Sequence, residues 1–499
     1  MIKTECGVYG IFSVNPSKSK IQETINGLKK LQHRGQESWG IGYLHNSNIK
    51  IHKEIGYVRN LDFQNNSFYI DTMSKINTNI CIGHVRYSTS GEGKNSNNQL
   101  LEESHPLKGH NKHLGKFAIC HNGNIPNKNN LINKILPKLS TSNQYVLNVL
   151  NSMSDTQLIL YYLEIMETTS WVEALKQFLN IVPGVYCLIL MTPEGLYAVR
   201  DCYGLRPLIL AISNNFGDKE WCITSESAAL IPDKYNFRDV KPGEILQLTK
   251  SGLNSFVSEN TNITPTHCIF EYVYFLRGNS KADGYLADDV RYQFGIELGK
   301  QEILDNPKMI SYFQEVGAIV SGVPTTGVAS GKGYTDITGL EYYQFIKKNH
   351  KMGRTFILQN DVQRQNACWK KYIIDEEKVR GREVILVDDS IVRGNTLKII
   401  IKMFINLGAK AIHIRVSSSP VKHPCYFGVD IPTYEELIGY RMTPDEICKN
   451  IGANSLLYIK YSGMTKAFEN VIPIDNKKKP LKFCGCCFNG NYDSKLLDW

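Results

Sequence analysis

Cys6 is the first residue in the sequence whose type and position could support covalent chemistry. It lies at the head of an apolar, β-prone stretch that covers residues 6–12. Removal of residues 1–5 would give the thiol its own free α-amine, whose near-neutral pKa lets it accept the thiol proton. Cys6 is then a candidate nucleophile that carries its own base. A small buried core cysteine is the alternative, and Cys6 taken alone favours that alternative.

Three further segments hold polar groups suited to binding and activating an amide. Arg86 follows an apolar strand and could hold a carboxylate through two parallel hydrogen bonds. The His-Asn-Gly-Asn run predicts a tight turn, in which the Asn122 amide and the Gly123 N–H could form an oxyanion hole. Asp155 opens a predicted helix, where it is either an N-cap or a binding group for the amine of an amino acid.

Residues 384–396 are the most informative stretch in the chain. An apolar strand ends in two adjacent carboxylates, Asp388 and Asp389, and a loop of small and hydroxyl residues then leads into a helix. Backbone N–H groups in such a loop can cradle a phosphate, whereas the carboxylates suit ribose hydroxyls or Mg²⁺. The Gly-Lys-Ser/Thr ending of a P-loop is absent. A solvated turn capped by aspartate is the alternative, and the combined pattern disfavours it.

The cysteines raise a separate question. The chain has 13 of them, and in a reducing compartment they are not expected to form a disulfide framework. Cys484 and Cys487 form a Cys-x-x-Cys motif, which alone indicates zinc, iron–sulfur or redox chemistry about equally. Cys268 and Cys425 lie far from this motif in the sequence and could be core thiols.

Short strands must position the candidate residues of the N-terminal half. Apolar, β-prone runs predict strands over residues 6–12, 80–87, 117–123 and 184–191. Helical periodicity is clear over residues 21–32, 155–166 and 171–180. This pattern is typical of an α+β domain with antiparallel strands.

The C-terminal half has a different pattern, which begins after a polar linker at residues 258–265. Strands are predicted over residues 317–324, 384–389 and 411–416, with a helix over residues 397–407. Strands that alternate with helices indicate a parallel, doubly wound sheet.

Length and composition limit the classes of protein that fit. The chain has 499 residues, 42% of them hydrophobic, so it is long enough for two or more domains. Its net charge of +9 is scattered apart from residues 477–479, which is more typical of a solvated surface than of a nucleic-acid site. No apolar run reaches the roughly 20 residues of a membrane helix, and the N-terminus does not resemble a signal or transit peptide. We therefore expect a cytoplasmic protein that binds neither membranes nor nucleic acids.

The motifs of the N-terminal half together resemble the class II glutamine amidotransferase domain. They occur at residues 6–12, 31–38, 83–89, 121–124 and 154–156. The resemblance implies a four-layer α/β/β/α sandwich that uses Cys6 as nucleophile, with Asn122 and Gly123 as the oxyanion hole. It also implies a supporting role for Arg34. The residues implied to bind glutamine are Arg86, Tyr87, Thr89 and Asp155.

The stretch that carries the paired aspartates resembles the phosphoribosyl-pyrophosphate loop of type I phosphoribosyltransferases. Together with residues 268–275 and 353–357 it is similar to the amidophosphoribosyltransferase family. This resemblance assigns Asp388, Asp389 and Thr326 to an Mg²⁺ and phosphoribosyl-pyrophosphate site. It assigns the region around residues 342–360 to a mobile loop that closes over the substrate. The remaining residues implied to bind this substrate are Arg354, Ser390, Val392, Arg393, Gly394, Asn395 and Thr396.

The cysteine contexts resemble the iron–sulfur branch of the same family. The resemblance implies that Cys268, Cys425, Cys484 and Cys487 hold a structural [4Fe–4S] cluster, which joins the C-terminal tail to the two domains. Cys486 is an additional thiol in this motif. Without the family, the residues alone fit a zinc site with four cysteine ligands equally well.

The resemblance covers nearly the whole chain and fades at residues 45–75, 91–103 and 465–482. The chain departs from the family pattern at residues 277–280, 325–326 and 348–353. The implied divisions are a propeptide at 1–5, the amidotransferase domain at 6–258, the phosphoribosyltransferase domain at 259–470 and a cluster-binding tail at 471–499.

The implied activity is glutamine-dependent transfer of ammonia to 5-phosphoribosyl 1-pyrophosphate, the first committed step of de novo purine biosynthesis. Family analogy adds purine nucleotides as feedback inhibitors and a homo-oligomer, either a dimer or a tetramer. One rival is another class II glutamine enzyme, such as a sugar-phosphate or asparagine synthetase, and the paired-aspartate loop argues against it. Another rival is a non-enzymatic nucleotide sensor, which an intact Met1 in the mature protein would support.

Overall fold

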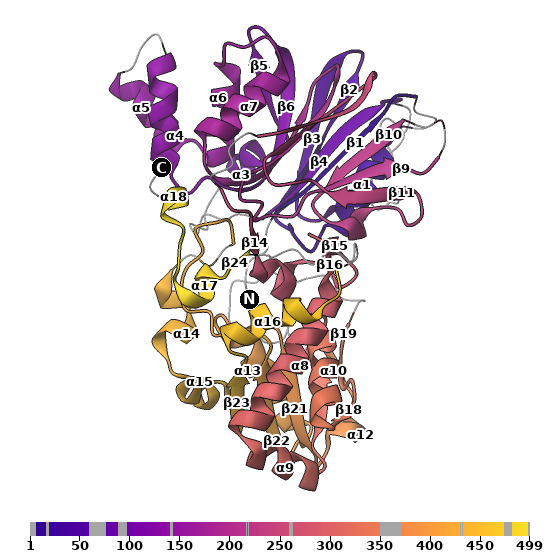
Figure 1. Cartoon of the computed structure of the whole chain (residues 1–499), viewed down its shortest axis with the longest axis vertical. Helices are drawn as coiled ribbons and strands as arrows, with labels where there is room; N and C mark the ends of the chain where they lie inside the picture. The colour runs from indigo at the N-terminus through magenta and orange to yellow at the C-terminus, as the bar shows by residue number, and fades with distance from the viewer. Residues whose placement is uncertain are drawn as a thin grey trace.

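The chain forms an antiparallel part, a parallel part and a C-terminal tail that lies where the two meet (Figure 1). The structure is a computed structural model. It describes residues 6–15, 19–58, 76–87, 97–139, 143–215, 217, 219–258, 263–349, 372–429, 431, 433–473 and 482–497. The predicted propeptide, Thr89, Arg354 and residues 350–360 of the predicted mobile loop lie outside these ranges.

The first antiparallel sheet has the strand order β11-β9-β10-β1-β4-β2-β3. Its central strands β1 and β4 are buried almost throughout. The strands span β1 (Gly7–Ser13), β2 (Ser38–His45), β3 (Asn48–Ile55), β4 (Ile80–Arg86), β9 (Ile209–Ser213), β10 (Glu220–Thr224) and β11 (Tyr235–Asp239).

The second antiparallel sheet has the strand order β13-β12-β8-β7-β6-β5. Its strands span β5 (Leu107–Asn111), β6 (Gly115–Asn124), β7 (Val185–Met191), β8 (Gly195–Arg200), β12 (Glu244–Thr249) and β13 (Gly252–Val257). The two sheets pack face to face, because alternate residues such as Val8 and Phe12 of β1 share one core with Ile189 of β7.

Helices cover both outer faces of the two sheets. On the first sheet, α1 (Lys20–Lys30) buries Ile25 and Leu28 against Tyr9. On the second sheet lie α4 (Lys128–Ile135), α6 (Asp155–Glu164) and α7 (Trp171–Ile181). The predicted four-layer α/β/β/α sandwich is therefore confirmed.

The parallel part is a sheet with the strand order β18-β17-β21-β22-β23. Its strands span β17 (Ile319–Gly322), β18 (Glu341–Tyr342), β21 (Glu383–Asp388), β22 (Ala411–Val416) and β23 (Ser455–Tyr458). Helices α8 (Ala287–Asp305), α10 (Gly327–Thr338) and α16 (Tyr461–Asn470) cover one face, and α13 (Asn395–Asn406) and α15 (Pro444–Ile451) cover the other.

Strand β21 shows why this sheet has helices on both faces. Ile385 and Val387 pack into the core beneath α8 and α10, whereas Val384 and Leu386 pack into the core beneath α13. A strand buried on both faces is typical of a parallel sheet, and the four residues form the continuous apolar run seen in the sequence. The predicted doubly wound domain is confirmed.

The C-terminal tail returns to the junction between the two parts. Its strand β24 (Lys482–Cys484) pairs in parallel with β14 (Thr266–Cys268), and α17 (Cys486–Asn489) follows. Phe488 of α17 stacks on Phe270, with ring centroids 5.8 Å apart. The tail then reaches the antiparallel part, where the Asn127 side chain donates a 3.0 Å hydrogen bond to the Leu497 carbonyl.

The other described elements are short or peripheral. They are α3 (Asn97–Glu103), α5 (Gln144–Ser152), α9 (Pro307–Glu315), α12 (Glu376–Val379), α14 (Ile438–Arg441), α18 (Ser494–Leu497), β15 (Lys281–Ala282), β16 (Tyr285–Leu286), β19 (Ile346–Lys348), β20 (Tyr372–Ile374), and the turns η2 (Leu136–Lys138), η3 (Ser227–Ala229), η4 (Glu271–Phe275) and η5 (Tyr434–Glu436). Among all the described residues, none of the helices is long and apolar enough to cross a membrane.

The tight turn predicted for the His-Asn-Gly-Asn run is wrong. The run is the end of strand β6, which stays paired with β7 up to Asn124. Gly123 has a φ of +148°, and a Cβ at this position would lie 1.9 Å from the Val185 carbonyl oxygen. Glycine is therefore required here for the close approach of two strands and not for a hairpin turn, which is the usual meaning of an Asn-Gly pair.

Candidate active sites

Cys6 lies immediately before β1, beside the end of the neighbouring strand β4. Its thiol is 3.6 Å from the Tyr87 carbonyl oxygen, because β1 and β4 run antiparallel with Gly7 opposite Val85. Burial raises the pKa of the Cys6 thiol to about 11, although the contact with Tyr87 and the charge of Arg86 oppose this shift. The thiol is protonated at neutral pH in this chain, so a nearby base is needed to activate it.

Asn122 and Gly123 lie near the end of β6, a strand that contacts both β1 and β4 and whose Cys120 is within the electrostatic influence of Cys6. The side-chain nitrogen of Asn122 is buried and has no hydrogen-bond partner within the described part of the chain. Buried amides are normally satisfied, so an orphaned donor at this position fits a role in binding an oxyanion.

Asp155 occupies the first turn of α6, but it is not the N-cap. Ser154 caps the helix in a capping box with Gln157, so the N-cap interpretation of Asp155 is wrong. The Asp155 carboxylate accepts a 2.7 Å hydrogen bond from the Thr156 N–H and lies 3.7 Å from Nδ1 of His121. Its charge is one of those that raise the pKa of the Cys6 thiol, which places this carboxylate in the field of the nucleophile.

Arg86 ends β4 and is already paired. Its guanidinium donates to the Glu103 carboxylate at 2.5 Å and to the Leu100 carbonyl at 3.3 Å. Glu103 therefore already holds one of the Nη atoms at which a substrate carboxylate could bind, and this pairing was not predicted from the sequence. Tyr87 follows directly, with its carbonyl oxygen at the Cys6 thiol.

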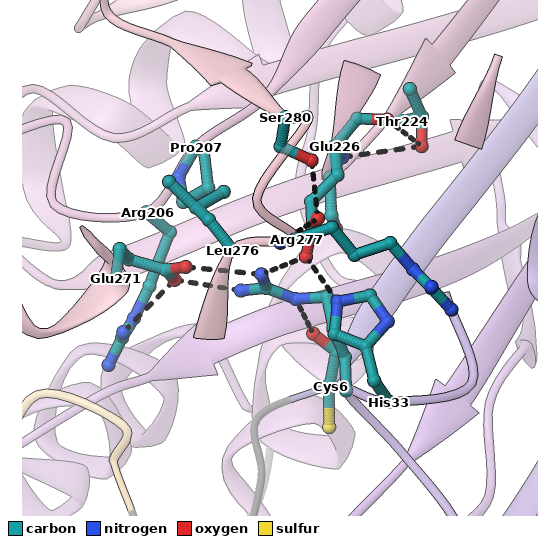
Figure 2. Close-up of polar contacts among 12 residues, drawn as sticks. Cys6, His33, Arg206, Pro207, Thr224, Glu226, Glu271, Leu276, Arg277 and Ser280 are labelled. Atoms are coloured by element: carbon teal, nitrogen blue, oxygen red, sulfur yellow. Dashed lines mark hydrogen bonds and ion pairs between the residues drawn. The ribbon is translucent and has the colours of Figure 1, made fainter. Parts of the chain in front are cut away.

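Arg34 is fully buried and belongs to a network of polar contacts with Cys6, Glu226 and Glu271, three residues that Figure 2 labels. Its Nε donates a 3.2 Å hydrogen bond to the Cys6 carbonyl oxygen. Its two Nη atoms donate to Glu226 at 2.6 Å and to Glu271 at 2.7 Å. The predicted supporting role of Arg34 thus has a physical basis, although the two glutamates were not predicted.

Glu226 is the most heavily bonded carboxylate of this network. It also contacts His33 at 2.7 Å and accepts hydrogen bonds from the Arg277 N–H at 3.0 Å and the Ser280 hydroxyl at 2.6 Å. Burial alone would raise the pKa of Glu226, but His33 and Arg34 outweigh it and hold the pKa well below its usual range. Residues 277–280, which depart from the family pattern, therefore dock onto the antiparallel part through Glu226.

The second site lies at the carboxyl edge of the parallel sheet. Asp388 ends β21, and Thr326 follows the neighbouring strand β17. The Thr326 hydroxyl donates a hydrogen bond to the Asp389 carboxylate, which also accepts one from the Ser390 hydroxyl at 2.6 Å. The structure thus brings together the three residues predicted to bind Mg²⁺ and substrate, at the edge where doubly wound sheets bind their ligands.

The predicted phosphate loop connects Asp389 to the start of α13. Gly394 has a φ of +77° and is the N-cap residue of α13, so Asn395 and Thr396 begin the helix. This arrangement exposes the first N–H groups of a helix next to a left-handed glycine, which is a favourable anion site. Val392 accepts a 2.9 Å hydrogen bond from the Ile438 N–H, which fixes the loop.

Two cations near this site were not predicted. Burial raises the pKa of Asp389, and the charges of Arg291 and Lys348 are among the influences that oppose this shift. Arg291 is itself buried and donates to the backbone carbonyls of Tyr272 and Leu276. Arg393, predicted to bind substrate, forms an ion pair with Glu436 in this structure.

The four cysteines predicted as cluster ligands come together at the junction. Cys268 and Cys484 are direct partners in the β14–β24 pair. Burial and then the charges of Cys425, Cys268 and Cys484 raise the pKa of the Cys487 thiol. The Cys486 thiol lies 3.4 Å from the Cys484 thiol.

The thiols are neighbours, but they are not arranged as a preformed metal site. Within the described ranges, no three His, Cys, Asp or Glu side chains are grouped as they would be around a metal ion. The residue types and their shared location still fit a group held by thiolates, because four cysteines from three separate segments meet there.

The antiparallel part is a four-layer sandwich with a cysteine at the head of its first strand, and the parallel part has acidic residues at its carboxyl edge. This combination defines a glutamine amidotransferase fused to a phosphoribosyltransferase-type domain. A family described as a glutamine amidotransferase domain matches residues 98–232. Comparison with known proteins narrows this class further.

The chain is 35% identical to the amidophosphoribosyltransferase of Drosophila melanogaster, over 99% of this chain and 90% of the fly protein. It is also 35% identical to the human protein of the same name, over 96% of this chain and 92% of that protein. The glutamine phosphoribosylpyrophosphate amidotransferase of B. subtilis, solved in complex with ADP and GMP, matches with a TM-score of 0.79 and 30% identity, over 98% of this chain and 97% of that chain. The chain belongs to the amidophosphoribosyltransferase family.

Proposed function

We propose that this enzyme transfers ammonia from glutamine to C1 of 5-phosphoribosyl 1-pyrophosphate. The products are 5-phosphoribosylamine, glutamate and pyrophosphate, in the first committed step of de novo purine (IMP) biosynthesis. The observation that carries the proposal is the presence of two complementary sites in one chain. The antiparallel sandwich carries Cys6 and the buried Asn122 amide, which has no hydrogen-bond partner in the described part of the chain. The edge of the parallel sheet carries Asp388 and Asp389.

The glutamine half-reaction begins once residues 1–5 have been removed. The freed α-amine of Cys6 accepts the thiol proton, and the thiolate sulfur forms a bond to the side-chain carbonyl carbon of glutamine. Asn122 and the Gly123 N–H stabilise the negative oxygen of the tetrahedral intermediate. The carbon–nitrogen bond then breaks, the nitrogen takes the proton and leaves as ammonia, and water hydrolyses the thioester to glutamate.

The acceptor half-reaction takes place at the edge of the parallel sheet. The ammonia nitrogen forms a bond to C1 of the ribose while the bond from C1 to the pyrophosphate oxygen breaks, and pyrophosphate leaves with the electron pair. The loop from Ser390 to Gly394 and the start of α13 hold the 5-phosphate through backbone N–H groups. Mg²⁺, when bound near Thr326, Asp388 and Asp389, would offset the charge of the departing pyrophosphate.

We further propose that Cys268, Cys425, Cys484 and Cys487 hold a structural [4Fe–4S] cluster, as in the iron–sulfur branch of the family. Support comes from the shared location of these thiols, of which Cys268 and Cys487 are buried and Cys425 and Cys484 half-buried. They belong to β14, to the segment after β22, and to the tail. When bound, the cluster would cross-link these three segments. A zinc ion held by the same cysteines is the alternative.

We also propose that purine nucleotides inhibit this enzyme and that it works in the cytoplasm as a homo-oligomer. The nucleotide proposal is supported by the B. subtilis structure, which was solved with ADP and GMP. The oligomer and the cytoplasmic location rest on family analogy alone.

The proposed activity is tested with processed protein, glutamine, 5-phosphoribosyl 1-pyrophosphate and Mg²⁺. Glutamate and pyrophosphate should form in equal amounts. Asp389→Asn should still release glutamate but little pyrophosphate, and Cys6→Ser should release pyrophosphate only when ammonium replaces glutamine. Asp305→Asn is a matched control at the exposed end of α8 and should retain both activities. Failure of the unmodified enzyme to release pyrophosphate with either nitrogen source would refute the proposal.

A further inference from the structure

Glu271 connects the parallel part of the chain to the nucleophile of the antiparallel part. It begins η4, just after the β14 strand that pairs with the tail. Its carboxylate accepts two hydrogen bonds from Arg34, at 2.7 Å from one Nη atom and 3.1 Å from the other. Figure 2 shows that Cys6, Glu226 and Glu271 all contact one guanidinium group, and that Arg206 contacts Glu271 from the other side.

Arg34 transmits this contact to the nucleophile. A planar guanidinium held by two parallel hydrogen bonds has a fixed orientation. That orientation directs its Nε–H at the Cys6 carbonyl oxygen, 3.2 Å away. Because the carbonyl belongs to the nucleophilic residue itself, the angle at which the thiol is presented depends on where Glu271 places Arg34.

The same carboxylate reaches the segment that carries Cys425. Arg206 donates a 3.4 Å hydrogen bond to Glu271 and a 2.5 Å hydrogen bond to the Phe427 carbonyl oxygen. The Phe427 N–H in turn lies 3.4 Å from the Cys425 sulfur, toward which it points. A path of hydrogen bonds therefore runs from Cys425 through the Phe427 backbone, Arg206, Glu271 and Arg34 to Cys6.

We propose that Glu271 is a positioning residue for the glutamine half-reaction, which it serves by fixing Arg34 and through it the Cys6 backbone. The inference rests on the proposed function of Cys6 as nucleophile. Glu271 acts on the nucleophile through Arg34, so its loss should slow the chemical step and leave glutamine binding by Arg86 and Asp155 largely intact. A small misplacement of a nucleophile can cost up to about 100-fold in rate.

A second buried ion pair offers a matched control. Arg200, at the end of β8, donates to Asp283 at 2.9 and 3.1 Å, and His267 lies 2.8 Å from the same carboxylate. This pair also joins the antiparallel part to a segment after β14, but Arg200 donates its other hydrogen bonds to the Val240 and Gly204 carbonyl oxygens. Loss of either pair removes an ionic contact between the two parts, and only the Glu271 pair should affect the nucleophile.

The test measures alkylation of Cys6 by a diazoketone analogue of glutamine in the full-length processed enzyme. Glu271→Gln should lower the maximal alkylation rate by about 10- to 100-fold and change the half-saturating concentration by no more than about twofold. Glu271→Asp keeps the charge and should recover part of the rate. Asp283→Asn should retain the full rate even where its melting temperature falls as far as that of Glu271→Gln.

Synthesis of 5-phosphoribosylamine from ammonium does not need Cys6. Both Glu271 variants should carry out this synthesis at a rate within about twofold of that of the unmodified enzyme. If Glu271→Gln is insoluble, Glu271→Asp alone carries the test. The inference is overturned if both Glu271 variants are alkylated at the unmodified rate, or if Asp283→Asn slows alkylation as much as they do. Absence of alkylation in the unmodified enzyme would instead refute the proposed role of Cys6.

Discussion

The Asn124 side-chain amide donates a 2.8 Å hydrogen bond to the carbonyl oxygen of Tyr426, 302 positions away in the chain. Asn124 ends the strand that carries the predicted oxyanion hole, and Tyr426 follows Cys425 in the parallel part. Gly428 reinforces the contact, since a Cβ at this position would lie 3.4 Å from the backbone of Gly123. The parallel part, which would use the ammonia, therefore contacts the strand end that carries the predicted glutamine site.

Gly123→Ala should impair glutamine hydrolysis. An alanine Cβ would collide with the Val185 carbonyl oxygen and shift the strand end that carries Asn122, so kcat for glutamate release should fall by about 10²- to 10³-fold. Gly115→Ala is the matched control, because Gly115 also has a positive φ but its Cβ would meet nothing within 4 Å. Steady-state glutamate release checks both variants, and equal loss in the two would point to general backbone strain.

Glu103→Gln should improve glutamine binding. Glu103 occupies the Arg86 guanidinium, which is predicted to bind the substrate carboxylate, so KM for glutamine should fall by about two- to fivefold with kcat unchanged. The neighbouring exposed Glu102 offers the control Glu102→Gln, which should leave KM as it is. An unchanged KM in Glu103→Gln would mean that Glu103 does not compete with the substrate.

Stability should fall on acidification because His84 is buried without charge. Burial, together with the charge of Arg86, lowers the pKa of His84 to about 3, and burial also lowers the pKa of His105 and of His121. In the unfolded chain a histidine has a pKa of about 6.5, so below this pH it is protonated there while His84 stays neutral in the folded protein. The free energy of unfolding should therefore decrease as pH drops below about 6.5, by up to ~1.4 kcal/mol per pH unit for His84 alone.

Urea unfolding between about pH 7 and pH 5 measures this dependence. Burial raises the pKa of Asp201 and of Asp239 to about 6, so these carboxylates titrate in the same range and oppose the effect, and the contribution of His84 is read from the difference between the unmodified chain and His84→Gln. His84→Gln should make the dependence shallower by close to one proton. His45→Gln, at the exposed end of β2, should leave it unchanged. A stability that is flat across this interval in the unmodified chain would contradict the prediction.

Loss of individual cysteines should separate the cluster ligands from the additional thiol. Cys487→Ser should abolish bound iron and leave the tail open to proteolysis, because Cys487 lies among the other three predicted ligands. Cys486→Ser should retain iron, since Cys486 instead donates to the Asn491 carbonyl at 2.9 Å. Iron and zinc analysis of both variants is the measurement, and full zinc occupancy without iron would exclude the cluster.

Local features of the sequence predicted the acceptor site well. Asp388, Asp389 and Gly394 lie within one strand–loop–helix unit, so their relative placement follows from short-range structure. Thr326 could be placed beside them because parallel strands present their carboxyl ends at one edge. The antiparallel half was predicted from strand patterns, but its register was not, and the Asn-Gly pair at residues 122–123 was therefore misread as a turn.

The buried ion network behind Cys6 could not be predicted. Arg34 lies 192 positions from Glu226 and 237 from Glu271, and charged residues are normally expected at the surface. Only the fold shows that the turn after α1, the segment after β10 and the π-helical turn η4 bring them together. Glu103 was also missed, because the sequence gives no indication that its carboxylate faces Arg86.

The proposed activity requires that the amide nitrogen of glutamine reaches C1 of the ribose, and isotope labelling measures this transfer. Processed enzyme would be given 5-phosphoribosyl 1-pyrophosphate and glutamine labelled with ¹⁵N at the side-chain amide. Unlabelled ammonium would be added in excess over the labelled glutamine, but below the concentration at which ammonium alone supports synthesis. One labelled 5-phosphoribosylamine should form for each pyrophosphate released. Pyrophosphate release with unlabelled product, or glutamate release with no pyrophosphate, would contradict the proposed activity.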